Sequence, residues 1–208
     1  MNNDSYTIPI AGEWSLEDLY VFPRTYEQCY FMYLALMSAD LGKDQDRIEH
    51  AYQAFPWQGG YSAVGFYNQL KWAVPKRQRP QIIRIEYASP GLIEISVVVA
   101  VAVAIEKIVK SLCESARDIN ATYNEIYRDL QERKLLRIKT EAEIRRLKKS
   151  EIRVIDAHAR ELGKAIDIDV EALNLKTGSP FKSLKIILSL YRRLRKLAKF
   201  QERGKTDL

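Results

Sequence analysis

The stretch from Ile82 to Lys110 constrains the fold of this chain more than any other segment. Between 83 and 87, in IRIEY, apolar and charged side chains alternate, and this period of two indicates a half-buried strand. Ser89-Pro90-Gly91 supplies a turn, and residues 92–95 repeat the strand character. Because glycine can adopt the positive φ that tight hairpin turns need, we expect an antiparallel hairpin here.

A helix is expected to follow this hairpin directly, with Ser96 as its cap. From Ile105 onward, apolar side chains recur at spacings of three and four, as in the seam of a coiled coil. No Pro or Gly lies between 92 and 162, so one continuous helix past residue 134 is favoured over an antiparallel pair of helices. The residues expected to form an oligomer seam are Ile105, Ile108, Leu112, Ile119, Tyr123, Ile126 and Leu130.

Aromatic residues divide the chain unequally. Sixteen of the 21 lie between Tyr6 and Tyr87, and a compact core is expected there because rings bury large areas. We therefore predict an α+β fold that begins with a small aromatic-rich head, residues 1–96, containing a short antiparallel sheet and helices. Long coiled-coil-like helices would form a stalk at 97–176. A basic amphipathic helix and its tail would occupy 177–208.

Positive charge is concentrated near the C-terminal end. The formal net charge is +6, but residues 182–205 hold nine Lys or Arg and one acid, so that segment alone carries +8. Ser179 and Pro180 are strong signals for the start of a helix. In that helix a basic stripe runs beside an apolar one at spacings of three and four. The candidate phosphate contacts are Lys182, Lys185, Arg192, Arg193, Lys196, Lys199 and Arg203.

Three interpretations of the basic stripe compete. Nucleic acid would be bound through its phosphates without regard to sequence. An anionic membrane surface would use the basic and apolar stripes together, but the apolar stripe lacks Trp and is needed for packing, so this interpretation is less favoured. The third is a solvated helix whose charge is neutralised by an acidic protein face.

The compartment is inferred from the two cysteines and from the apolar runs. Cys29 and Cys113 lie far apart and form no CxxC motif, which favours a reducing environment. The uncharged run 95–105 is too short for a transmembrane span, which needs about 20 residues. The N-terminal residues do not resemble a secretory signal. We therefore expect a cytoplasmic protein.

Familiar catalytic patterns are not visible in the sequence. The two histidines, His50 and His158, fall on different predicted helices, and Cys29 lies among aromatic residues, as a core cysteine would. The acids Asp167, Asp169 and Glu171 suit a helix start, where the helix dipole favours them, better than a metal site. We expect a non-enzyme without a cofactor or metal. The remaining enzymatic hypothesis places a pocket near the turn at 57–61.

The leading functional hypothesis is a non-enzymatic oligomeric scaffold or adaptor. Its stalk would assemble copies of the chain, and its head would recognise a protein partner. The alternative hypothesis is a nucleic-acid-binding protein that uses the basic C-terminal helix, with help from the basic loop at 76–79.

Overall fold

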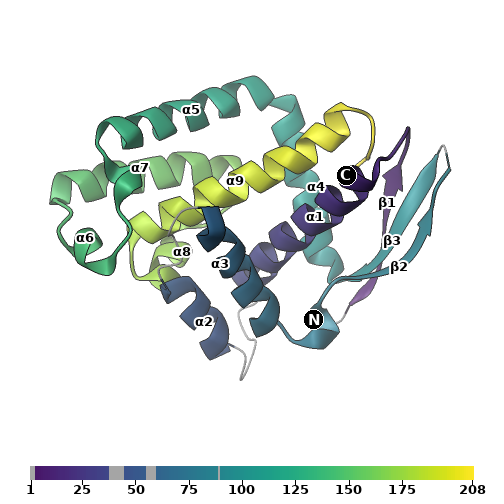
Figure 1. Cartoon of the computed structure of the whole chain (residues 1–208), viewed down its shortest axis with the longest axis horizontal. Helices are drawn as coiled ribbons and strands as arrows, with labels where there is room; N and C mark the ends of the chain where they lie inside the picture. The colour runs from purple at the N-terminus through teal and green to yellow at the C-terminus, as the bar shows by residue number, and fades with distance from the viewer. Residues whose placement is uncertain (1–2, 38–44, 55–59, 89) are drawn as a thin grey trace.

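The computed structural model describes residues 3–37, 45–54, 60–88 and 90–208. Within these residues the chain is mostly helical and carries a small three-stranded antiparallel sheet at one end, so the α+β class is confirmed (Figure 1). The elements are β1 (Asp4–Ile10), α1 (Leu16–Met37), α2 (Gln45–Gln53), α3 (Gly60–Ala73), η2 (Lys76–Gln78), β2 (Gln81–Glu86), β3 (Gly91–Val97), α4 (Val99–Glu114), α5 (Ala116–Glu132), η3 (Leu135–Arg137), α6 (Glu141–Arg145), α7 (Lys149–Ala165), α8 (Val170–Thr177) and α9 (Pro180–Glu202).

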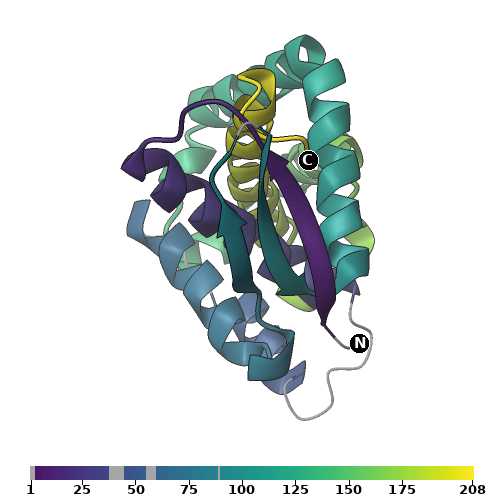
Figure 2. The ribbon, with the colours of Figure 1, turned by 90° about the vertical axis from the view of Figure 1, so that its right-hand side faces the viewer.

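The predicted hairpin is present as β2 and β3. The strands run antiparallel with Ile85 opposite Ile93, and β1 pairs with the other side of β3, which gives the order β1-β3-β2. Gly91 is required at the turn, because a Cβ there would lie 2.4 Å from the carbonyl oxygen of Glu86. One face of the sheet is turned away from the helices (Figure 2).

The inner face of the sheet contributes to the core of the molecule. Ile8 on β1 and Ile93, Ile95 and Val97 on β3 are buried, whereas every residue of β2 is exposed. The strands β1 and β3 are therefore covered by helices, and β2 is not.

The C-terminal helix α9 runs through the middle of the fold. It packs against α1, α4, α7 and α8, and its apolar face is buried throughout. Beyond it the chain turns back to the sheet, where Thr206 bridges to Ile10 and Lys205 forms an ion pair with Asp18 at 2.6 Å. The last segment thus ties α9 to both β1 and α1.

The buried residues form one hydrophobic cluster that spans the expected head and the expected stalk. Residues of α1 and α3 belong to the same cluster as residues of α4, α7 and α9, and α1 packs directly on α4 and α9. The expected boundaries at 96 and 176 therefore do not separate two cores.

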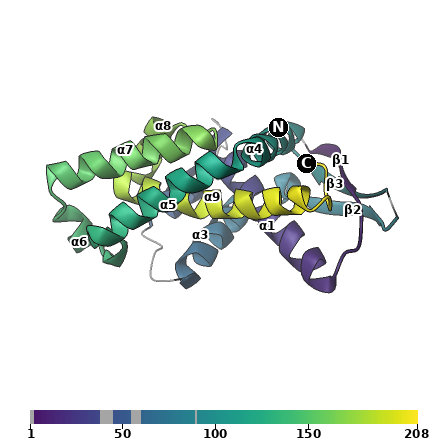
Figure 3. The same cartoon turned by 90° about the horizontal axis from the view of Figure 1, so that it is seen from above.

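The prediction of one continuous helical rod is wrong. The helix bends at Ser115, between α4 and α5, and the two parts point in clearly different directions (Figure 1). After α5, Lys134 adopts a left-handed conformation with φ 60°. The chain then reverses through η3 and α6, so that α7 lies alongside α9 (Figure 3).

The start of α4 also differs from the prediction. The strand β3 continues through Ser96, and Val98 rather than Ser96 precedes the helix without a side-chain cap. The Val98 N–H instead donates to the buried hydroxyl of Tyr30 at 3.0 Å, and that hydroxyl donates to the carbonyl of Gln78 at 2.8 Å. Tyr30 on α1 thereby supplies the hydrogen-bond acceptor for the backbone N–H group at the junction between β3 and α4.

We predict that Tyr30→Phe lowers the free energy of unfolding by about 1–3 kcal/mol, because the buried Val98 N–H loses its acceptor. Denaturant titration would measure the change. Tyr20→Phe is the matched control: it removes an exposed hydroxyl on the same helix, and its effect should stay within about 0.5 kcal/mol. Equal effects of the two substitutions would contradict the role given to Tyr30.

Candidate functional site

The basic C-terminal helix is present, and the predicted start signal is confirmed in part. Pro180 is the first residue of α9 and Ser179 is its N-cap, although the Ser179 side chain makes no capping hydrogen bond. Gly178, with φ 65°, ends the preceding helix α8. Proline suits the first helical position because its missing N–H would have no helical partner there.

Three of the seven candidate phosphate contacts are tied into the protein. Lys182 is buried; its ammonium donates to the carbonyl of Gln53 at 2.6 Å and forms an ion pair with Glu141. Lys185 donates to the carbonyl of Leu136. These two lysines are held by groups of the chain and do not offer a free charge to a ligand.

Arg193 is the third of these cations. Its guanidinium donates to the side chain of Gln28 at 2.6 Å and to the hydroxyl of Ser189 at 2.6 Å, and it lies 4.0 Å from the ring centroid of Tyr67. Arg193 therefore joins α9 to α1 and α3. Its donors are directed at the protein itself.

The other four candidates form a continuous exposed line, which we call the cationic crest: Arg192, Lys196, Lys199 and Arg203. All four side chains are exposed. Their spacings of four, three and four place them on one face of the helix. Among the residues that the structure describes, none of the four has an ion-pair partner.

The crest lies between two packed flanks of α9. On one flank Tyr191 stacks on Tyr123 of α5, with ring centroids 4.8 Å apart, and Arg195 pairs with Glu202. On the other flank Arg193 contacts α1 and α3, as described above. Because both flanks are packed, the backbone that carries the crest is fixed along the outer side of α9.

The residues expected to form an oligomer seam are placed inside the chain. Ile105, Ile108, Leu112, Ile126 and Leu130 are buried within the single chain, and Ile119 and Tyr123 are half-buried against the same core. The helices that carry them pack on α1, α7 and α9. The pattern correctly indicated a buried face, but the chain itself covers that face, so it is not a free surface for a second copy.

Two of the side chains considered for catalysis, Cys29 and His158, are enclosed or paired within the protein. Cys29 is fully buried, and burial raises the pKa of its thiol to about 12. His158 is 2.8 Å from a carboxylate oxygen of Asp129. Burial by itself would raise the pKa of Asp129, but hydrogen bonds from His158 and Arg133 outweigh it and lower that pKa.

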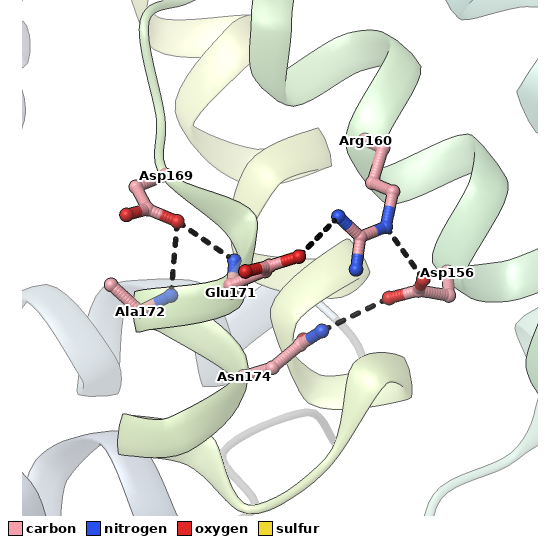
Figure 4. Close-up of polar contacts among 6 residues, drawn as sticks. All are labelled: Asp156, Arg160, Asp169, Glu171, Ala172 and Asn174. Carbon is pink, nitrogen blue, oxygen red and sulfur yellow. Dashed lines mark hydrogen bonds and ion pairs between the residues drawn. The ribbon is translucent and has the colours of Figure 1, made fainter.

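The acids near residue 170 form part of a helix junction. Asp169 caps α8 by accepting from the backbone N–H groups of Glu171 and Ala172, at 2.9 and 3.0 Å (Figure 4). Glu171 pairs with Arg160, which also binds Asp156. Asp167 has a positive φ of 52° after α7. The described residues contain no group of acids, histidines and cysteines suited to hold a metal ion.

The pocket expected near the turn at 57–61 falls largely outside the described residues, which resume at Gly60. Within the described part of the chain, every helix is too short or too polar to serve as a membrane span.

Comparisons of the chain with protein-family models, curated protein sequences and solved structures found no match.

The half-buried Lys185 on α9 makes stability depend on pH. Burial, with a smaller contribution from the nearby Arg192 cation, lowers the pKa of Lys185 to about 8, below the ordinary value near 10.4. The cost of burying the charged form is therefore complete below pH 8. It is relieved as the pH rises from about 8 toward 10, where the folded state releases its proton first.

We predict that Lys185→Met raises the free energy of unfolding at pH 7 by about 1–3 kcal/mol and that this gain shrinks between about pH 8 and 10. Denaturant titrations across that range would measure it. Lys196→Met, at an exposed position on the same helix, should change stability little. A gain for Lys185→Met that is constant with pH would contradict the prediction.

Proposed function

We propose that this protein is a non-enzymatic binding protein that holds nucleic acid through the cationic crest of α9. The observation that carries the proposal is that Arg192, Lys196, Lys199 and Arg203 are exposed, aligned and without ion-pair partners among the described residues. Cations in this state can exchange their counterions for the phosphates of a polyanion, which is the main source of sequence-independent affinity.

The length of the crest suits a phosphate backbone. Arg203 lies eleven positions after Arg192, so the crest extends about 16 Å at 1.5 Å per residue. One strand of a DNA duplex presents about five phosphates over that distance. The crest is therefore long enough to lie against several phosphates of one backbone.

Packing of α9 favours nucleic acid over a membrane surface. A helix that lies on a membrane inserts its apolar face between the lipids. The apolar face of α9, including Leu190, Leu194 and Leu197, is fully buried in the core. Only the charges are available, and a binding mode that uses charges alone fits a backbone of phosphates.

The scaffold expected from the sequence would assemble through its helical seam. Assembly through the seam at 105–130 is not proposed, because those side chains are covered within the chain. A protein with an acidic face remains the competing partner for the crest.

The two separate cysteines, Cys29 and Cys113, make the cytoplasm the expected place for this binding.

The test is the affinity for a labelled oligonucleotide as a function of salt. We predict that replacing the four crest cations with Gln abolishes measurable binding at moderate salt. Removing about four phosphate contacts should also reduce the slope of log K against log[salt] by about 3–4 in magnitude on duplex DNA. Fluorescence anisotropy would give both quantities.

The matched control removes four exposed cations elsewhere, Lys107, Lys149, Arg153 and Lys164. It lowers the net charge equally and should retain most of the affinity and nearly the same salt slope. If both variants weaken binding equally, net charge rather than the crest is responsible. If the unaltered protein shows no salt-dependent binding, the proposal is wrong and an acidic protein partner becomes the better candidate.

A further inference from the structure

The strand β2 forms an uncovered edge of the sheet. It pairs with β3 on one side only, and all of its residues are exposed. Ile82, Ile83 and Ile85 are 52%, 55% and 46% exposed. An edge strand presents a row of unpaired backbone donors and acceptors and can therefore pair with another strand.

Apolar surface continues from this edge toward α1. Ile82 lies opposite Ile95 and Ile85 opposite Ile93, so both point to the inner, apolar side of the sheet. Between β2 and α1 lies a groove of about 230 Å³, whose walls include Phe22, Pro23 and Ile82. The inner side of β2 is thus an apolar surface that no described element covers.

The outer side of the same strand is charged in a regular way. Arg84 forms ion pairs with Glu86 at 2.5 Å and with Glu94 of β3 at 3.3 Å. Arg84 and Glu86 therefore point to the same outer face, on either side of the inward-pointing Ile85. The register is irregular between Ile82 and Arg84, so the regular part of the edge is the Arg84–Glu86 end of β2.

We propose that a second copy of this chain pairs with β2 in an antiparallel arrangement, joining two sheets into one of six strands. The two copies would be related by a two-fold axis perpendicular to the sheet. Opposite residues in an antiparallel pair point to the same face. The axis must therefore pass midway between the two copies of one residue, which then lie opposite each other; below, this is called an axis through that residue. An axis placed half a residue further along would put an inward side chain opposite an outward one.

Within the regular part of the edge, at 84–86, the charges of β2 select one register. An axis through Arg84 places two guanidinium groups opposite each other, and an axis through Glu86 does the same with two carboxylates. Like charges directly opposite one another are unfavourable. An axis through Ile85 places Arg84 of each copy opposite Glu86 of the other, twice, and packs the two Ile85 side chains together on the inner face.

This self-complementarity favours a second copy over an unrelated strand. The pattern cation–isoleucine–anion, read in the antiparallel direction, becomes anion–isoleucine–cation. Each Arg84 would lie between Glu94 of its own chain and Glu86 of the other copy. The inference does not depend on the nucleic-acid proposal, because β2 and the crest on α9 share no residues.

The experiment is a charge exchange across the edge. Arg84→Glu alone gives four carboxylates in the pair, and Glu86→Arg alone gives four guanidinium groups. Each should weaken self-association by about tenfold or more.

An equimolar mixture of these two variants restores opposite charges at both positions, so it should form a mixed dimer. The double variant R84E/E86R should dimerise with itself. Light scattering on a sizing column would measure each case.

Matched controls change the charge equally at exposed sites away from β2, with Lys107→Glu and Glu161→Arg, and should leave the dimer intact.

Hydrogen exchange of the backbone amides at 82–86 can be measured on the unaltered protein, and protection there should rise with protein concentration. The proposal is overturned by a monomer throughout the micromolar range, by a dimer that both single variants leave unchanged, or by exchange at 82–86 that is independent of concentration. Loss of the crest cations should not alter the dimer, which separates this result from the test of nucleic-acid binding.

Discussion

The structure depends on the packing of α9 against four other helices. Its buried face contacts α1, α4, α7 and α8, and its following segment returns to β1. Short helices such as α8, with eight residues, are marginal by themselves in water and take most of their stability from tertiary packing. The same helix that organises the core therefore has only its outer face left for charges, which is where the cationic crest lies.

Local signals in the sequence predicted local structure well. The alternation at 83–87 and the glycine at 91 located the hairpin, and Pro180 located the start of α9, because these features act over a few residues. The spacing of apolar residues from Ile105 to Leu130 showed that one face is buried, but such spacing does not say what covers it. The same spacing is expected whether a second chain or α9 covers the face. The reversal after α5 did have a signal, the capping box formed by Thr140 and Glu143, which marks a new helix start.

The candidate site could be predicted only as a set of residues on a helix. Spacing assigned the cations to one side of α9, yet Lys182 and Lys185 lie in the first half of the helix, where nearly every residue is buried. These two lysines, and Arg193 further along, turn back to protein partners. Long cationic side chains can pack their stems on apolar surface and direct their charged ends to distant groups. The partners, Gln53, Leu136 and Gln28, come from other segments, so no pattern within 180–202 reveals them. The exposure of β2 could not be predicted either. The alternation in 83–87 predicts a strand with one covered face, but it does not show whether a helix of the chain lies over that face.

The two proposed surfaces would act together in a definite way. A dimer joined at β2 carries two cationic crests, and binding of one crest raises the effective concentration of the second along the same polymer. Salt weakens each phosphate contact through counterion release, whereas the edge combines two charge pairs with apolar contacts and backbone hydrogen bonds, which depend less on salt. Increasing salt should therefore release the nucleic acid before it separates the dimer. A protein that lost both at the same salt concentration would have to hold its two copies together through the nucleic acid itself.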